Sequence, residues 1–421
     1  MSRYKATLIL SIFLLFAGCS QKSPTVKIGK KAFANEDILI INAIEAQRQK
    51  NYKKAMKTLG ILYKKSGKLN YLEEENKVAV RAADPSSYDL LMSSIKKYPN
   101  NLLFKKLLIQ YHVGKKQYKR AEAKTLELLK IEKNSRNLTL MGDIYMLEKS
   151  YKLALKYYQS AFNKDKSQKS LLNMVGILYK FLDRKQEAIS YLETFIRLHD
   201  ANKRVYFTLI QIYGQEKNLD GIISTYKKLY KKYKKEGFAK KVIELLVYKK
   251  DKNGAIKFLK NSGYNPKMLL SIYTSDNNFK EAYKVAKQLY AKSGDVDFLG
   301  KMAIYQYEAS RKHLNKKILN SVSRKFENAL KDFQNPVYLN YYGYLLIDHN
   351  IDVKKGIKLV KRALEVEPKS IFYLDSLAWG YYKLNRCKEA YDIMKKFAKS
   401  SNEPEVNMHF EKIIKCLKES K

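Results

Sequence analysis

Three cysteines are the residues whose chemistry this 421-residue sequence places most definitely. Cys19 directly follows an apolar stretch near the N-terminus, whereas Cys387 and Cys416 lie close to the C-terminus. A cysteine thiol can be acylated, can bind a metal or can pair with a second thiol, and its surroundings decide between these reactions. No histidines or further cysteines stand at metal-ligand spacing. Acylation and pairing are therefore the reactions to consider.

Residues 1–18 are organised as a secretion signal. Two basic residues precede an apolar run from Ala6 to Phe16, which is too short to span a bilayer as a stable helix. The small residues before Cys19 resemble the bacterial lipoprotein signal, although Phe16 stands where that signal usually has leucine. The resemblance implies that Cys19 is acylated, with palmitate among its chains, and becomes the mature N-terminus. Ser20, rather than aspartate, favours an outer-membrane anchor facing the periplasm. An ordinary signal peptide with an incidental cysteine is the alternative.

Cys387 and Cys416 are predicted to form a disulfide. The connection from Ser400 to Pro404 lies midway between them, so two antiparallel helices folded about it bring the two cysteines side by side. The periplasm is oxidising, and two thiols remain once Cys19 is acylated. A loop of about 30 residues would contribute on the order of 3–4 kcal/mol, mostly by restricting the unfolded chain. Two buried free thiols are the alternative, because the bond has strict geometry.

No motif for catalysis or cofactor binding is present. The sequence has no phosphate loop, no dinucleotide glycine fingerprint, no HExxH and no nucleophile elbow. No pair of carboxylates stands out as an acid and a base. The five histidines are far apart in the sequence, at His112, His199, His313, His349 and His409. We expect no enzymatic activity, no cofactor and no metal.

The elements that must position these residues are helices that repeat at an interval of 34 residues. Three successive copies share a small or apolar residue three before a tyrosine, then small and large residues in a second helix. They are Met141-Gly142-x-x-Tyr145 with Ala154, Tyr158 and Ala161, Val175-Gly176-x-x-Tyr179 with Ala188, Leu192 and Phe195, and Leu209-Ile210-x-x-Tyr213 with Ile222, Tyr226 and Leu229. The pattern resembles the tetratricopeptide repeat. The resemblance implies an all-α superhelical solenoid of about eleven helix pairs, since a single pair cannot bury its apolar face alone.

Composition agrees with such a fold. Of the residues, 45% are hydrophobic and 12% aromatic, which argues against disorder, and 17 Gly and 7 Pro are too few for an all-β protein. The domains predicted are a signal at 1–18, the lipidated cysteine and a tether at 19–35, N-terminal repeats at 36–236, degenerate repeats at 237–336 with a polar insertion at 310–317, two C-terminal repeats at 337–403, and a capping helix at 404–421. The capping helix carries Val406, Phe410, Ile413, Ile414 and Leu417 on one face, as expected of an element that covers the last repeat.

Partner-binding residues can be carried over from the repeat family, whose ligand contacts come from the first helix of each pair. The matching positions predict Asn173, Lys180, Arg204, Phe207, Gln211, Tyr344, Asp375, Trp379 and Tyr382. The ninth position lacks the asparagine of the family's carboxylate clamp, so we expect capture of a peptide or helix by mixed aromatic contacts. Trp379, the sole tryptophan, is the expected anchor. Packing of Trp379 against a neighbouring repeat is the alternative.

The chain is strongly basic, with 83 Lys and Arg against 41 Asp and Glu and a formal charge of +42. Such a field attracts acidic partners or anionic surfaces and weakens with salt. A secreted lipoprotein meets little nucleic acid, so we expect no nucleic-acid partner. The densest run predicts a basic patch of Lys227, Lys228, Lys231, Lys232, Lys234 and Lys235. A solvated lysine face is the alternative.

Two functions follow. The first is a lipid-anchored periplasmic scaffold or adaptor that binds other envelope proteins during assembly of a cell-envelope machine. The second is an adaptor that binds an anionic envelope polymer, glycan or lipid through its basic surface. Binding by the second mechanism would fall steeply as salt rises, whereas binding in a groove would depend on aromatic side chains. The identity of the partner stays open.

Anchoring can be tested at Cys19. Replacing Cys19 with alanine removes the thiol that the lipid would modify, so we expect loss of both lipid labelling and membrane fractionation. Metabolic labelling with a fatty acid and fractionation after a salt wash measure the two. A Cys19→Ala protein that stays with the membrane after the wash would show that the lipoprotein assignment is wrong.

Overall fold

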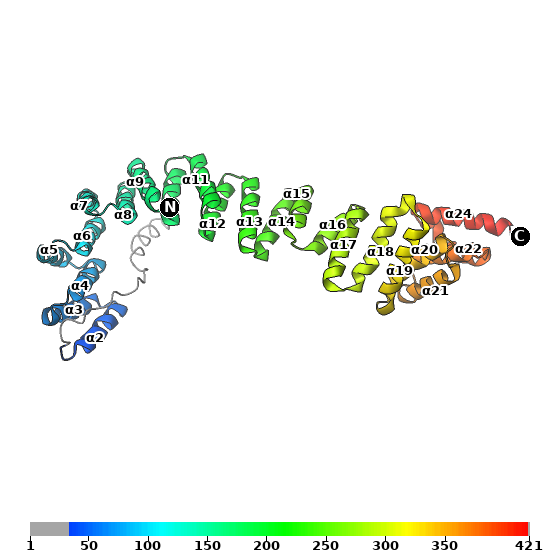
Figure 1. Ribbon diagram of the computed structural model, residues 1–421, viewed down its shortest axis with the longest axis horizontal. Helices are drawn as coiled ribbons and strands as arrows, with labels where there is room; N and C mark the ends of the chain where they lie inside the picture. The colour runs from blue at the N-terminus through cyan, green and yellow to red at the C-terminus, as the bar shows by residue number, and fades with distance from the viewer. Residues whose placement is uncertain (1–32, 420–421) are drawn as a thin grey trace. The chain divides into compact units, whose positions relative to one another are not determined.

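The computed structural model describes residues 33–419, and every regular element in that range is a helix (Figure 1). The predicted signal, Cys19 and the predicted tether up to residue 32 lie outside the described residues. Within each of the two compact units that the chain forms, most consecutive helices pack against each other. Within the described range these form eleven pairs, from α2 and α3 to α22 and α23, followed by α24. The predicted all-α fold of stacked helix pairs is confirmed.

The chain divides into two compact units, and the division falls between Leu229 and Tyr230. The helices of the first unit are α2 (Glu36–Arg48), α3 (Tyr52–Ser66), α4 (Leu69–Arg81), α5 (Ser87–Lys97), α6 (Leu102–Gly114), α7 (Tyr118–Ile131), α8 (Ser135–Leu147), α9 (Tyr151–Asp165), α10 (Gln168–Lys180), α11 (Lys185–Leu198), α12 (Lys203–Gln215) and most of α13 (Leu219–Tyr233). Its core is made of apolar side chains that face each other between consecutive helices, such as Leu62, Ile109, Leu128 and Ile144.

The second unit begins with the end of α13. Its other helices are α14 (Glu236–Tyr248), α15 (Lys252–Ser262), α16 (Pro266–Ser275), α17 (Phe279–Ser293), α18 (Val296–Ser310), η2 (Arg311–His313), α19 (Lys316–Asp332), α20 (Pro336–Asp348), α21 (Val353–Val366), α22 (Ile371–Lys383), α23 (Cys387–Met394), η3 (Ala398–Ser400) and α24 (Pro404–Glu419). One apolar cluster joins α18 to α24, and it contains Phe326, Tyr342 and Trp379. The predicted boundaries at 236/237, 336/337 and 403/404 lie beside the first residues of α14, α20 and α24.

The turn between the two helices of a pair contains a residue type that rarely adopts a left-handed backbone conformation. In ten of the eleven described pairs, one non-glycine residue between the two helices adopts a positive φ, as Lys149 (63°), Lys217 (53°) and Asn385 (56°) illustrate. Asparagine tolerates this left-handed region better than most residues, whereas lysine is strained there. The exception is the pair α18 and α19, where η2 and the predicted insertion Ser310–Lys317 form the connection. The helix pairs therefore need a left-handed residue in this turn. Because non-glycine residues occupy these positions, the backbone adopts that conformation at a cost in conformational energy.

Helix starts are set by short polar side chains. The side chain of Asn134 accepts a hydrogen bond from the backbone N–H of Asn137, and Asn202 and Asn335 cap α12 and α20 in the same way. An asparagine at this position supplies an acceptor to backbone N–H groups that have no partner within the helix. Asparagine before a helix therefore helps to place the first residue of several pairs.

Glycine has different consequences at two equivalent positions. A Cβ atom added to Gly142 would lie 2.5 Å from Cε1 of Tyr158, a buried ring of the paired helix. A Cβ atom added to Gly176 would meet nothing within 4 Å. The residue that occupies the place of Tyr158 in this second pair is Leu192, which has no ring to reach the glycine. Of these two pairs, only α8 and α9 require glycine for the close approach of their helices.

Gly142→Ala and Gly176→Ala should change stability in opposite directions. Gly142→Ala displaces the Tyr158 ring and should lower the free energy of unfolding by about 1–3 kcal/mol. Gly176→Ala fills open space in a helix interior and should raise it by up to about 1 kcal/mol. Urea denaturation followed by far-UV circular dichroism measures both. Equal effects of the two substitutions would contradict this account of the helix crossing.

Candidate protein-interaction surfaces

Two neighbouring first helices, α10 and α12, lie side by side and run in the same direction. Near their starts, the backbone N–H of Asn202 donates to Oε1 of Gln168 at 2.9 Å. Near their ends, the hydroxyl of Tyr179 donates to Oε1 of Glu216 at 2.8 Å. Lys185, at the start of α11, also pairs with Glu216 at 3.1 Å. These polar contacts hold the two first helices in register, so their outward residues form one surface.

Five predicted partner-binding residues lie on these two helices. Asn173 is half-buried and Lys180 is exposed on α10, while Arg204, Phe207 and Gln211 are exposed on α12. The ring of Phe207 is 44% exposed, which is unusual for a phenylalanine. Not every family position reaches this surface. The corresponding α10 residues Ser170 and Ile177 are buried.

Asp143 on α8 occupies the ninth position, where the carboxylate clamp of the family has asparagine. Burial raises the pKa of Asp143 to about 6, whereas the hydrogen bond from the Tyr158 hydroxyl and the charge of Lys169 lower it. Burial also lowers the pKa of Lys169, against the attraction of Asp143. Above that pKa a negative charge at this position repels a C-terminal carboxylate. Asp143 therefore does not favour binding of a C-terminal carboxylate at this position.

The predicted residues of the second unit have a different environment. Asp375 and Trp379 on α22 are buried, at 6% and 4% exposure, and Tyr344 on α20 and Tyr382 on α22 are half-buried. The element that covers Asp375, Trp379 and Tyr344 is α24. The expectation that Asp375 and Trp379 line an open groove is therefore corrected, because the last helix of the chain lies on them.

His409 on α24 is the centre of this contact. Its side chain is fully buried, and Nδ1 donates to the carboxylate of Asp375 at 2.9 Å from Oδ2. Its ring stacks on the indole of Trp379, with centroids 4.0 Å apart and planes 18° from parallel. The indole Nε1 donates to Oδ1 of Asp348 at 3.0 Å, and Tyr382 stacks on the indole at 4.7 Å. Trp379 therefore packs within the unit, which is the alternative interpretation of this residue.

Sequence reasoning did not identify His409 as a contact residue. The predicted inner face of the helix includes Phe410, Ile414 and Leu417, yet these three are only half-buried. The buried residues of α24 are Val406, His409 and Ile413. The spacing i, i+3 and i+7 of these three is the signal that could have found the face.

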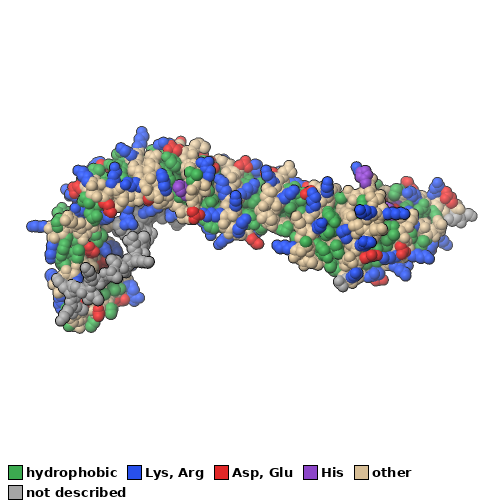
Figure 2. Space-filling model, in the orientation of Figure 1, with side chains coloured by type: hydrophobic (Ala, Val, Ile, Leu, Met, Phe, Trp, Pro, Cys, Tyr) green, Lys and Arg blue, Asp and Glu red, His purple; other side chains and the backbone are tan. Residues whose placement is uncertain are grey.

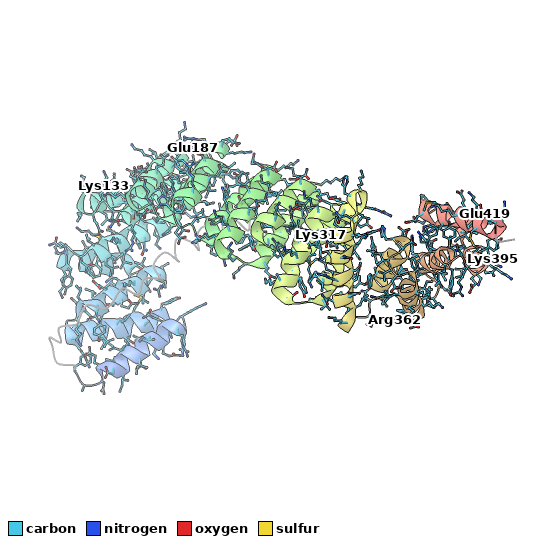
Figure 3. The ribbon with its side chains drawn as sticks, turned by 45° about the vertical axis from the view of Figure 1, so that its right-hand side comes forward. Lys133, Glu187, Lys317, Arg362, Lys395 and Glu419 are labelled. Atoms are coloured by element: carbon cyan, nitrogen blue, oxygen red, sulfur yellow. A yellow bond between two sulfur atoms is a disulfide. The ribbon has the colours of Figure 1, made fainter. Side chains whose placement is uncertain are left out.

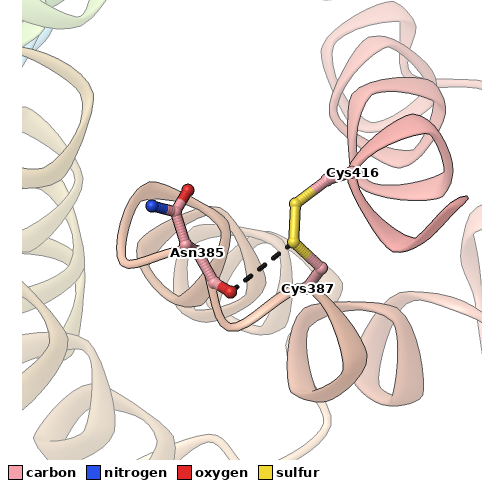
Figure 4. Close-up of a disulfide and its surroundings, with 3 residues drawn as sticks. All are labelled: Asn385, Cys387 and Cys416. Carbon is pink, nitrogen blue, oxygen red and sulfur yellow. Dashed lines mark hydrogen bonds between the residues drawn. A yellow bond between two sulfur atoms is a disulfide. The ribbon is translucent and has the colours of Figure 1, made fainter. Parts of the chain in front are cut away.

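A disulfide joins α23 to α24 (Figure 4). Cys387 is the first residue of α23, Cys416 lies near the end of α24, and their Cα atoms are 5.8 Å apart. The backbone carbonyl oxygen of Asn385 lies 3.6 Å from Sγ of Cys387. The cysteine pair that the sequence proposed is thus bridged in the structure, at the end of α24 opposite to Glu405.

The six lysines of the predicted basic patch lie on α13 and directly after it. Lys227 is half-buried, whereas Lys228, Lys231, Lys232, Lys234 and Lys235 are exposed. The division between the two units falls within these six residues, after Leu229. On the face that Figure 2 shows, Lys and Arg side chains are spread over both units, with Asp and Glu among them. The side-chain view in Figure 3 likewise labels Lys133 in the first unit and Lys317 and Lys395 in the second. The visible positive charge is therefore distributed and has no single centre.

Two further properties of residues 33–419 concern membranes and metals. None of the helices in this range combines the length and hydropathy needed to cross a bilayer. The same residues hold no group of three or more His, Cys, Asp or Glu side chains that could bind a metal ion.

Comparisons with known proteins add little to this picture. No family model matches the sequence, and a comparison with curated proteins found no match. Among solved structures, the chain is similar to PilF of Pseudomonas aeruginosa, at 17% identity and a TM-score of 0.35, over 47% of this chain and 91% of that one. It is also similar to Naa15/Naa10 bound to HypK-THB (12%, 0.31, 89% and 65%) and to the APC/C hetero-tetramer Cut9–Hcn1 (14%, 0.31, 90% and 90%). Likenesses this distant carry no argument about partners, and the fold class rests on the helix packing itself.

Trp379→Ala separates the two interpretations of the tryptophan. Because the indole is buried against His409 and Tyr382, we expect the substitution to lower the stability of the second unit by roughly 3–5 kcal/mol. Phe372→Ala, on the same helix but at a side chain that is 54% exposed, is the matched control and should change stability by less than about 0.5 kcal/mol. Chemical denaturation measures both. A stable Trp379→Ala variant that no longer captures a partner would restore the anchor interpretation.

Proposed function

We propose that this protein is a lipid-anchored scaffold of the bacterial cell envelope that faces the periplasm and binds other envelope proteins. The lipoprotein-like signal that ends at Cys19 supports the location. The bridged pair Cys387 and Cys416 supports an oxidising compartment. The stacked helix pairs offer extended surfaces of the kind that bind proteins.

The observation that carries the binding role is the open surface of α10 and α12. It exposes the aromatic residue Phe207, with the exposed side chains of Arg204 and Gln211 on the same helix and the exposed Lys180 at the end of α10. An exposed aromatic residue surrounded by polar groups is a common anchor at protein interfaces. A peptide or helix with an apolar residue and acidic neighbours would match this chemistry.

An adaptor for an anionic polymer, glycan or lipid is the second candidate. The formal charge of +42 supports it, since such a charge raises the rate and strength of encounter with anionic surfaces. The spread of Lys and Arg over the face in Figure 2 fits many weak contacts rather than one site. This candidate requires no particular aromatic residue.

Site-specific crosslinking at position 207 tests the scaffold. A photoreactive amino acid in place of Phe207 should yield a discrete crosslinked protein in the native envelope. The same substitution at Leu153 should not, because this residue is equally exposed (44%) but lies on α9, a second helix. Phe207→Ala should weaken capture of that protein by about 1–3 kcal/mol with unchanged helix content.

Salt decides between the two candidates. Capture through the α10–α12 surface should persist at 0.5 M salt or so, where the Debye length is about 4 Å, whereas polymer or lipid binding should be largely lost. Crosslinking of equal yield at 207 and 153 would contradict the assignment of this surface. Binding that disappears with salt and ignores Phe207→Ala would favour the adaptor.

A further inference from the structure

Helix α24 does more than cover the apolar surface of the last helix pair. Residues of α24 contact α22, α20 and the segment that directly follows α18. His409 meets Asp375 and Trp379 on α22, and Glu405 accepts a hydrogen bond from the Tyr344 hydroxyl on α20 at 2.5 Å. Glu405 also lies 3.8 Å from the guanidinium of Arg311, which follows α18. The helix therefore lies across α20 and α22 and reaches the segment that follows α18.

The contact has the chemistry of ligand recognition. It combines a charged hydrogen bond from His409 to Asp375, an aromatic stack on Trp379, and two apolar side chains, Val406 and Ile413. Lys412 adds an ammonium group 5.4 Å from the centre of the Trp379 ring. Inward residues at i, i+3 and i+7 are the usual anchors of an amphipathic helix in a groove.

The fit of α24 is nevertheless incomplete. Of its sixteen residues, Val406, His409 and Ile413 are buried, and Met408 is 41% exposed. Nε2 of His409 is buried without a hydrogen-bond partner, which costs free energy. The short helix α23 and the segment from Lys395 to Glu403 form the connection to α24 at one end. The Cys387–Cys416 disulfide holds the other end.

We propose that the face formed by α20 and α22 is a helix-binding site, that α24 is its resident occupant, and that a partner's amphipathic helix replaces α24 after the Cys387–Cys416 disulfide is reduced. The partner helix has the pattern of α24, in which the acidic Glu405 is followed by three inward residues, Val406, His409 and Ile413. This site is separate from the α10–α12 surface and does not depend on the proposed anchor or scaffold role.

Reduction supplies the freedom for the exchange. A dithiol reductant transfers two electrons and two protons to the sulfurs of Cys387 and Cys416, which become thiols, and is itself oxidised to a disulfide. While the disulfide is intact, α24 is held at both ends and a second helix cannot displace it. Once it is reduced, α24 remains attached only through residues 395–403 and competes as a tethered ligand.

Trp379 provides a direct measurement of the exchange, because it is the only tryptophan of the chain and lies against His409. In the full-length mature protein, we expect dithiothreitol to shift the Trp379 emission to longer wavelength and to increase its quenching by acrylamide. The oxidised and the reduced protein are also compared for binding of a fluorescein-labelled peptide of residues 404–419 with serine in place of Cys416. Its fluorescence anisotropy should show binding to the reduced protein at least about tenfold tighter than to the oxidised protein.

Two variants of the full chain refine the test. His409→Ala removes the stack and the hydrogen bond to Asp375, so it should increase peptide binding under reducing conditions. Met408→Ala, next to it on α24 but directed outward, is the matched control and should behave as the wild type. Far-UV circular dichroism confirms folding. If His409→Ala does not fold, the oxidised and reduced wild type still decide the question without any substitution.

Three outcomes would overturn the proposal. The first is unchanged Trp379 emission and no peptide binding after reduction, because α24 is then a fixed cap. The second is undocking of α24 without peptide binding, because the face then has no affinity for a free helix. The third is equal peptide binding to oxidised and reduced protein. None of them affects crosslinking at position 207, so failure here and failure of the scaffold role are distinguishable.

Discussion

An apolar face that no helix pair can bury alone is the constraint on which this structure depends. Each pair of helices covers part of its neighbour, as Leu128 of one pair and Ile144 of the following pair show, since both are buried in one apolar cluster. Stability is then a sum over neighbouring contacts, and substitutions act locally. Gly142 illustrates this, because it is needed to accommodate the Tyr158 ring, while Gly176 at the equivalent position of the next pair is not.

Polar contacts between first helices add register to the apolar packing. The links from Gln168 to Asn202 and from Tyr179 to Glu216 align α10 with α12, so that Lys180 and Phe207 belong to one surface. A similar link joins Tyr338 on α20 to Asp297 on α18, with the hydroxyl 2.6 Å from Oδ1. Apolar contacts alone are non-directional and would leave the relative shift of two helices less well defined. The position of the surface residues follows from these specific hydrogen bonds.

At the last helix pair, a single helix instead of a further pair covers the apolar face. The last pair has no following pair, and α24 buries Val406 and Ile413 against it. It also buries the face on which a ligand would be expected, through His409 and Glu405. Burial raises the pKa of Tyr344, and its hydrogen bond to Glu405 acts in the same direction. One helix thus serves both to close the core and to fill a candidate binding face.

The sequence by itself predicted the helix pairs, their period, a capping helix at 404–421 and a disulfide between Cys387 and Cys416, with two free thiols as the alternative. Each of these predictions follows from local pattern, since apolar spacing and the length of one connection act between residues close in the chain. The surroundings of Trp379 could not be obtained in this way. The tryptophan is equally compatible with an open groove and with a buried contact until the path of α24 is known. That path depends on contacts between His409 and Asp375 and between Glu405 and Tyr344, residues far apart in sequence whose meeting only the tertiary structure decides.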